Sequence, residues 1–231
     1  MKDISFDVLS ELRLQPEESF NWEGKQTSLY CLVPGNVSKY PRTVVQTLSH
    51  LTNHYQGVFY VPGNLEFELT PFGLKHRVEE LCEIVSQIPN VVILYQHVVI
   101  VDGVAILGIN GWADGGDETT QDGLLRTELR LEDTIYLRQS IQRLQKHLDV
   151  KKILIMSNGV PNTKLYYGEE PEITEYQVPL DIALEADTEN KVVEWVFGSY
   201  DKAVDISIDN IHYVNNPYVR KSPYWSKRIS V

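Results

Sequence analysis

Side chains that could bind a cation, or pair with one another, follow five strand-like segments of this sequence. They carry carboxylate, amide, hydroxyl or guanidinium groups, and they are Glu11, Arg13, Asn36, Asn64, Asn158, Ser199 and Asp201. Because ligands collect beyond the carboxyl ends of strands in α/β folds, we expect these side chains to converge. The oxygen atoms among them suit a hard cation such as Mg²⁺ or Mn²⁺. The guanidinium of Arg13 has no lone pair and can only donate hydrogen bonds.

Short apolar runs predict the strands that position these groups. The runs cover Phe6–Leu9, Leu29–Val33, Val58–Val61, Val91–Leu94, Ile153–Met156 and Val192–Phe197. Such nearly continuous runs are typical of central strands that are covered on both faces.

Apolar residues at helical spacing lie between the strands. The first set is Val44, Leu48, Leu51 and Tyr55, and Pro41 before it is at a position suited to a first helical turn. The second set is Leu74, Val78, Leu81, Val85 and Ile88. The third set is Leu137, Ile141, Leu144 and Leu148. Each set predicts a helix that packs one face against the core.

Two further segments predict antiparallel hairpins. Asp102-Gly103 separates Val98–Val101 from Val104–Leu107, and this dipeptide favours a type I′ turn. Asp205–Asp209 and Ile211–Val214 indicate a second hairpin. The sheets should therefore be mixed, in an α/β or α+β fold with layered sheets and flanking helices. No linker or repeat divides the sequence, so we expect a single domain over residues 1–231.

The residues after successive strands resemble the calcineurin-like metallophosphoesterase superfamily over nearly the whole chain. That family carries S-D-x-H, G-D, G-N-H-[DE], a lone His before a Pro, and G-H-x-H. The matching residues here are Ser10, Leu12, Gly35, Gly63, Asn64, Glu66, Ser157, Pro161 and Gly198, with further matches over residues 108–112 and at Asn216-Pro217. The resemblance implies a four-layer β-sandwich of mixed sheets flanked by helices.

The metal ligands of that family are largely replaced in this chain. By resemblance, Glu11 and Arg13 occupy the first Asp and His positions, Asn36 the bridging Asp position, Asn158 the lone His position, and Ser199 and Asp201 the last two His positions. Asn64 is retained, and Leu65 stands at the position of the catalytic His. Active members hold two cations that share a bridging hydroxide. We therefore expect no metal and no catalytic residue at this site.

The charges left at these positions suggest a rebuilt cleft. Without cations, Glu11 and Asp201 would place like charges near each other in a partly dry site, which is unfavourable. Arg13 comes from the same loop as Glu11, and its guanidinium can pair with both carboxylates. The hypothesis is a metal-free cleft in which Arg13 occupies the vacated metal position.

Composition excludes several other classes of protein. Of 231 residues, 42% are hydrophobic and 23% are charged, as in ordinary globular proteins. The formal net charge of −11 disfavours nucleic-acid binding, because phosphates would be repelled. Two cysteines make no disulfide framework. The sequence has no signal-like or membrane-spanning apolar run, so we expect a cytoplasmic protein, or a virion component if the chain is phage-encoded.

The final segment, residues 217–231, is basic and rich in aromatic residues. Its candidate interface residues are Tyr218, Arg220, Lys221, Tyr224, Trp225, Lys227 and Arg228, with no acidic residue among them. Aromatic residues and arginine are enriched in interface hot spots, so this segment could contact a protein partner or a second copy of the chain. The alternative is an ordinary edge strand with solvated basic side chains.

Two functions are compatible with these residues. The first is a non-catalytic binding or assembly module, a pseudoenzyme that needs no cofactor. The second is a phosphoesterase that hydrolyses phosphomonoesters or phosphodiesters at an altered, mononuclear site, with Mn²⁺ or Mg²⁺ held by oxygen ligands. The replaced ligands favour the first function, and fold resemblance alone does not carry activity.

Overall fold

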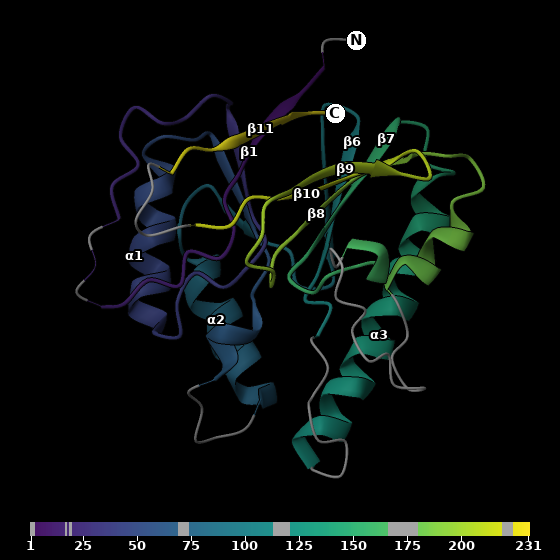
Figure 1. Ribbon diagram of the computed structural model, residues 1–231. Coiled ribbons are helices and arrows are strands. Elements are labelled where there is room, and N and C mark those ends of the chain that lie inside the picture. The colour runs from purple at the N-terminus through teal and green to yellow at the C-terminus, as the bar shows by residue number, and fades with distance from the viewer. Residues whose placement is uncertain are drawn as a thin grey trace.

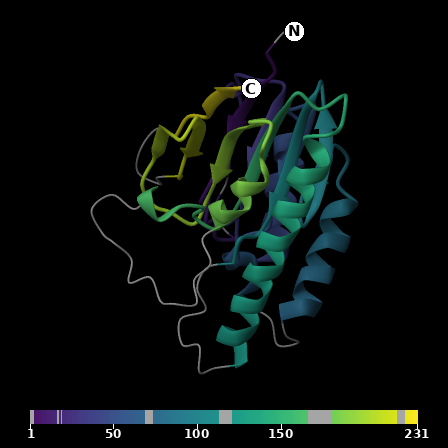
Figure 2. The same cartoon turned by 90° about the vertical axis from the view of Figure 1, so that its right-hand side faces the viewer.

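A computed structural model describes residues 3–16, 18, 20–68, 74–112, 121–165, 180–218 and 224–231. Two β-sheets pack face to face between outer helices (Figures 1 and 2). Helices α1 (Pro41–Thr52) and α2 (Leu74–Ser86) lie outside the first sheet, whereas α3 (Gln121–Leu144) and the 3-10 helix η3 (Leu180–Ala186) lie outside the second. Two shorter 3-10 helices, η1 and η2, span Asn64–Phe67 and Thr163–Leu165. The predicted four-layer α/β architecture is confirmed.

The first sheet has five strands in the order β11-β1-β2-β3-β4. These strands are β1 (Ser5–Val8), β2 (Tyr30–Val33), β3 (Gly57–Tyr60), β4 (Val91–Ile93) and β11 (Lys227–Ser230). Strands β1 to β4 are parallel, and β11 pairs with β1 in the antiparallel direction. The last strand of the described chain therefore closes the edge of the sheet beside the first strand.

The second sheet has six strands in the order β5-β6-β7-β8-β10-β9. They are β5 (His97–Val101), β6 (Val104–Ile109), β7 (Lys152–Ser157), β8 (Val192–Phe197), β9 (Val204–Ile208) and β10 (Ile211–Asn215). Both predicted hairpins are present, as β5–β6 and β9–β10. Parallel pairing joins β6, β7, β8 and β10. The central strands β6, β7 and β8 are mostly apolar because both of their faces are covered.

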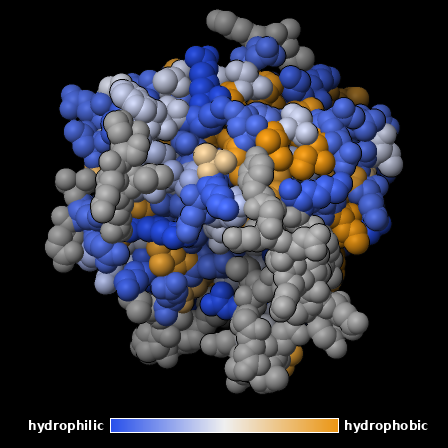
Figure 3. All heavy atoms as spheres, viewed as in Figure 1, coloured by the Kyte–Doolittle hydropathy of each residue, from blue (hydrophilic) through white to orange (hydrophobic). Residues whose placement is uncertain are grey.

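Three hydrophobic clusters hold the four layers together. The central cluster lies between the sheets and includes Phe6, Leu32, Ile106 and Val214. The two outer clusters fill the spaces between each sheet and its helices. Among the coloured residues of the face in Figure 3, hydrophilic ones predominate, with smaller hydrophobic patches between them. No helix in the described residues combines the length and apolarity needed to cross a membrane.

The third helix differs most from its prediction. The apolar spacing starts at Leu137, but α3 begins at Gln121. Its first half contains good helix formers, and its leucines are spread around the helix instead of forming one stripe. Leu148 was predicted to share the buried stripe, which is wrong: the helix ends at Leu144, and Leu148 is exposed in the following turn.

The carboxyl-terminal segment is integrated into the first sheet, as its alternative interpretation predicted. Tyr224 is buried, and its hydroxyl donates to the Asn216 carbonyl at 2.6 Å. Lys227 pairs with Asp205, and Arg228 donates to the Ser5 hydroxyl. These contacts place Tyr224 in the core and join Lys227 and Arg228 to neighbouring elements, while the Arg228 side chain stays exposed. An interface at Lys227 and Arg228 stays a prediction. Arg220 and Lys221 lie outside the described residues.

Two further aromatic residues of that segment differ in exposure. Tyr218 is partly buried and stacks edge-on against the Tyr224 ring. Trp225 is 63% exposed. Of the predicted interface residues that the structure describes, Trp225 therefore has the most exposed aromatic ring.

The closing strand should be required for stability. Ile229 is only 3% exposed and packs in the cluster between the sheets. Ile229→Ala should lower the free energy of unfolding by about 2–4 kcal/mol, because it leaves a cavity. Trp225→Ala should change it by less than about 0.5 kcal/mol. Urea denaturation followed by circular dichroism measures both, and equal losses for the two variants would contradict this packing.

Candidate functional site

The loops that follow β1, β2, β3, β7 and β8 meet where the two sheets adjoin. Asn158 Nδ2, after β7, donates to the Pro34 carbonyl after β2 at 3.0 Å. The Ser199 N–H, after β8, donates to Glu11 Oε1 after β1 at 2.6 Å. These bonds join loops of the first sheet to loops of the second. The convergence predicted from the sequence is therefore present.

Glu11 is the centre of this cluster. Its side chain is 2% exposed, and both of its carboxylate oxygens accept hydrogen bonds. Asn36 Nδ2 lies 2.8 and 3.0 Å from the two oxygens, and Arg13 donates to Oε2 from Nε at 3.0 Å and from Nη2 at 2.7 Å. Burial raises the pKa of Glu11, whereas the Ser199 N–H and the Arg13 guanidinium act in the opposite direction.

Arg13 connects Glu11 to the second carboxylate of the cluster. Its Nη2 lies 2.9 Å from Asp201 Oδ1, so one guanidinium contacts both acidic side chains. Arg13 is 47% exposed, and Asp201 lies at the surface. The pairing inferred from the sequence is thus observed, with a buried end at Glu11 and a solvated end at Asp201.

Backbone N–H groups orient two of the three asparagine side chains in this cluster. Asn36 Oδ1 accepts the Leu65 N–H at 3.0 Å, and Asn158 Oδ1 accepts the Asn64 N–H at 3.1 Å. Asn64 Oδ1 is buried and has no hydrogen-bond partner in the described part of the chain. Two of the three amide oxygens are therefore already used to fix the loop after β3.

Backbone conformation at the cluster is unusual. Glu11, Arg13, Asn36 and Ser199 have φ values of 55°, 46°, 55° and 55°, in the left-handed region that non-glycine residues seldom adopt. Each such residue costs about 1–2 kcal/mol. The surrounding contacts must hold these turns, which is a property common at functional sites.

Glycine is required where the loops touch. A Cβ at Gly63 would lie 2.4 Å from the Asn36 nitrogen, and one at Gly198 would lie 2.4 Å from the Pro34 carbonyl oxygen. No larger residue fits without displacing the backbone. These contacts explain two of the glycines on which the family resemblance rests.

Glu66 joins the loops that follow β2 and β3 through hydrogen bonds. Its fully buried carboxylate accepts the backbone N–H groups of Asn36, Val37 and Gly63 at 3.2, 2.6 and 3.0 Å. Burial raises the pKa of Glu66 to about 7, although the Val37 N–H lowers it in part. The buried carboxylate therefore organises the turn from within the fold.

Several polar groups near the site were not predicted. Asp133 of α3 is buried, accepts the Gly111 N–H at 2.7 Å and the Gln96 amide at 3.0 Å, and burial raises its pKa to about 6. Nothing in the local sequence distinguishes it from an exposed helical acid. His50 Nε2 accepts the Trp22 N–H at 3.1 Å.

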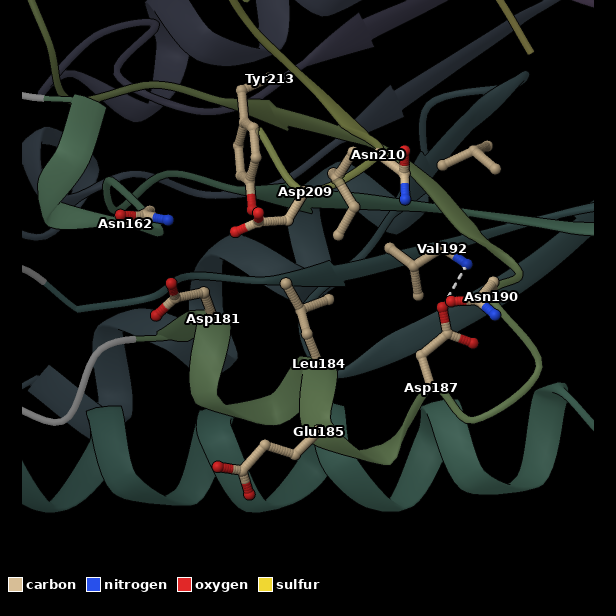
Figure 4. Close-up of a pocket in the computed structure, with 12 residues that line it drawn as sticks. Asn162, Asp181, Leu184, Glu185, Asp187, Asn190, Val192, Asp209, Asn210 and Tyr213 are labelled. Atoms are coloured by element: carbon tan, nitrogen blue, oxygen red, sulfur yellow. Dashed lines mark hydrogen bonds between the residues drawn. The ribbon is translucent and has the colours of Figure 1, made fainter. Parts of the chain in front are cut away.

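A separate cavity of about 400 Å³ lies between η3 and the β9–β10 hairpin (Figure 4). It contains none of the predicted site residues. Asp187 accepts the N–H groups of Lys191 and Val192, so this carboxylate caps the adjoining loop. Glu185 and Asp209 form ion pairs with Arg138 and Lys164 at the surface.

Comparison with solved structures identifies the class of fold. No protein-family profile and no curated protein sequence matches the chain. The structural neighbours include a phosphopantetheinyl hydrolase, and the chain has the calcineurin-like phosphoesterase fold predicted from its sequence.

The particular neighbours differ in length and in described role. Phosphopantetheinyl hydrolase from Mycobacterium tuberculosis has a TM-score of 0.65 and 13% identity, with 98% of this chain and 96% of that chain covered. A protein from Staphylococcus aureus, described as a candidate 5′-nucleotidase in complex with α-ketoglutarate, has a TM-score of 0.55 and 14% identity, covering 92% of this chain and 48% of its own. GAP50, described as the anchor in the inner membrane complex of Plasmodium, has a TM-score of 0.51 and 11% identity. The alignment covers 92% of this chain and 70% of GAP50.

The buried Glu66 carboxylate should make stability depend on pH. Its pKa of about 7 exceeds the ordinary value of 4.5, so the folded state holds the proton more tightly than the unfolded state does. Stability should therefore fall as pH rises from about 4.5 to 7, by up to roughly 3 kcal/mol. Urea denaturation at several pH values measures this slope.

Comparison with Glu66→Gln isolates this effect, because Glu194 and Asp133 also have raised pKa values. The variant should be less stable throughout but should show a shallower slope between pH 5 and 7. Glu185→Gln, at an exposed position, should retain the original slope. An unchanged slope in Glu66→Gln would show that Glu66 does not titrate in this range.

Proposed function

We propose that this protein is a non-catalytic binding or assembly module on a metallophosphoesterase fold. The observation that carries the proposal is the position of Arg13, whose guanidinium contacts the carboxylates of both Glu11 and Asp201. A permanent cation there supplies the positive charge that metal ions supply in active members of the fold. In this proposal the protein needs no metal cofactor and acts through a protein partner.

The donor set does not fit a pair of divalent cations. A dinuclear site requires carboxylates and neutral imidazoles that converge with free lone pairs. Here the oxygens of Asn36 and Asn158 accept backbone N–H groups, and Glu11 accepts hydrogen bonds at both oxygens. No group of three or more His, Cys, Asp or Glu side chains suited to a metal ion occurs among the described residues.

The position of the acid–base catalyst also lacks a suitable group. Leu65 follows Asn64, and its aliphatic side chain can neither donate a proton to a leaving group nor accept one. The known neighbours are described both as hydrolases and as an anchor, so this fold is compatible with either role.

One observation favours the alternative, an altered metal-dependent phosphoesterase. Asn64 Oδ1 is buried without a partner, and an amide oxygen in that state could bind a single Mg²⁺ or Mn²⁺. In this alternative, Arg13 would have to move away from Glu11 so that the carboxylate becomes available.

Metal analysis and a hydrolysis assay distinguish the two functions. The purified protein should contain no stoichiometric metal and should not hydrolyse an aryl phosphate monoester or diester in the presence of Mn²⁺. Stoichiometric metal together with turnover that Asn64→Ala abolishes, but Asn53→Ala at an exposed position does not, would establish the phosphoesterase instead.

We expect the Arg13 guanidinium to exclude divalent cations from the cluster around Glu11. Arg13→Ala leaves Glu11 and Asp201 unpaired, so stability should fall by about 1–2 kcal/mol, given that Arg13 is half exposed. Mn²⁺ or Mg²⁺ should raise the melting temperature of this variant more than that of the unaltered protein. Calorimetry at matched ionic strength measures the shift.

Arg138→Ala is the matched control, because Arg138 forms an exposed ion pair with Glu185. Divalent cations should have the same effect on this variant as on the unaltered protein. If Arg13→Ala responds no more strongly than Arg138→Ala, Arg13 does not take the place of a cation.

A further inference from the structure

A groove of about 530 Å³ lies between α2 and the first half of α3, outside the cluster around Glu11. Its lining residues come from both helices and from the β4–β5 connection. They are Val78, Glu79, Cys82, Tyr95, Gln96, Leu125, Glu128, Leu129 and Glu132. The two helices therefore form the walls of one groove.

The floor of the groove is apolar and has a helical repeat. Val78 and Cys82 are four residues apart on α2, and Leu125 and Leu129 are four residues apart on α3. Residues at this spacing lie on one face of a helix, so two apolar ridges line the groove. Such grooves receive an amphipathic helix through anchors at positions i, i+3 or i+4, and i+7.

Further apolar side chains are exposed on α3 beside the groove. Leu124, Leu131 and Ile135 are exposed, and their spacing of seven and then four residues places them on a single stripe. Large exposed aliphatic residues gathered on one helix are uncommon in a monomer and mark interaction surfaces. The surface available to a partner thus extends beyond the groove itself.

The rim of the groove is acidic. Glu79, Glu128 and Glu132 are exposed, and none forms an ion pair with a described residue. Three arginines of the same helices contact other groups: Arg77 contacts Glu80 and the Glu66 carbonyl, Arg130 contacts the Gly111 and Trp112 carbonyls, and the Arg126 guanidinium lies 5.9 Å from the centre of the Trp112 ring. The uncompensated charge at the rim is therefore negative.

We propose that this groove binds an amphipathic helix of a partner protein, with apolar anchors on one face and lysine or arginine at its flanks. Charge complementarity selects this occupant, because a basic helix neutralises the three rim carboxylates. A second copy of this chain, with its net charge of −11, would meet electrostatic repulsion. By naming the partner, this inference rests on the proposed binding function.

A charge-swap experiment tests the proposal. The probe is a fluorescent helical peptide with leucine at i, i+3, i+4 and i+7 and lysine at flanking positions; its control carries glutamate in place of lysine. The lysine peptide should bind, and Glu128→Lys with Glu132→Lys should weaken it by about tenfold or more while improving binding of the glutamate peptide. Fluorescence anisotropy measures both affinities.

Two controls separate groove binding from general attraction to an acidic protein. Glu185→Lys with Glu189→Lys reverses two exposed charges outside the groove and should leave the affinity within about twofold. Replacing the leucines of the peptide by serine should abolish binding. Equal losses in both charge-reversal pairs, or no binding of the lysine peptide, would overturn the proposal.

Cys82 provides a direct readout of occupancy. It is partly exposed in the groove, whereas Cys31 is fully buried. Saturating lysine peptide should slow alkylation of Cys82 by N-ethylmaleimide at least about fivefold, and Cys31 should stay unmodified throughout. Equal alkylation rates with and without peptide would contradict binding at this position.

Light scattering tests whether a second copy of this chain occupies the groove instead. The protein should be monomeric, and a dimer that Leu129→Asp dissociates would replace the partner helix with a second copy of the chain. These measurements involve neither metal nor hydrolysis. Failure of peptide binding would therefore overturn only the proposed occupant of the groove, whereas bound metal with turnover would overturn the proposed non-catalytic role.

Discussion

The burial of the Glu11 carboxylate is the constraint on which the cleft depends. A carboxylate removed from water is unfavourable unless charged or polar donors replace its hydration. Here the donors come from three loops: Arg13 follows β1, Asn36 follows β2 and Ser199 follows β8. Satisfying one charge therefore fixes the relative position of turns that belong to two different sheets.

The rest of the cleft supports the same arrangement. Four non-glycine residues have left-handed backbone conformations, which they would leave for more favourable ones if their loops were free. Contacts between the loops hold them in place. Glu66 gathers backbone N–H groups from two loops, and Gly63 permits the close approach. The loops of this phosphoesterase-like fold thus surround a buried carboxylate whose charge is compensated by the Arg13 guanidinium and the Asn36 amide.

The sequence was sufficient to predict the sheets and the convergence of the site residues. Apolar runs located the central strands, and the charges of Arg13, Glu11 and Asp201 implied the pairing observed. It could not predict how each asparagine amide is turned, because that depends on loops distant in sequence. Nor could it distinguish Tyr224 as a core residue, since an aromatic ring suits a core and an interface equally. The first half of α3 lacked a single apolar stripe, and the groove that it forms became visible only in three dimensions.

The hydrogen bond between Ser10 and Asn215 joins residues 205 positions apart, at 2.6 Å. Together with the β1–β11 ladder, it gives the fold a high contact order, and such long-range pairing is slow because chain entropy must be lost before the contact forms. Because Ser10 directly precedes Glu11, we expect the turn that carries Glu11 to reach its final conformation only after this closure. We therefore expect the cleft to be among the last parts of the molecule to assemble during folding.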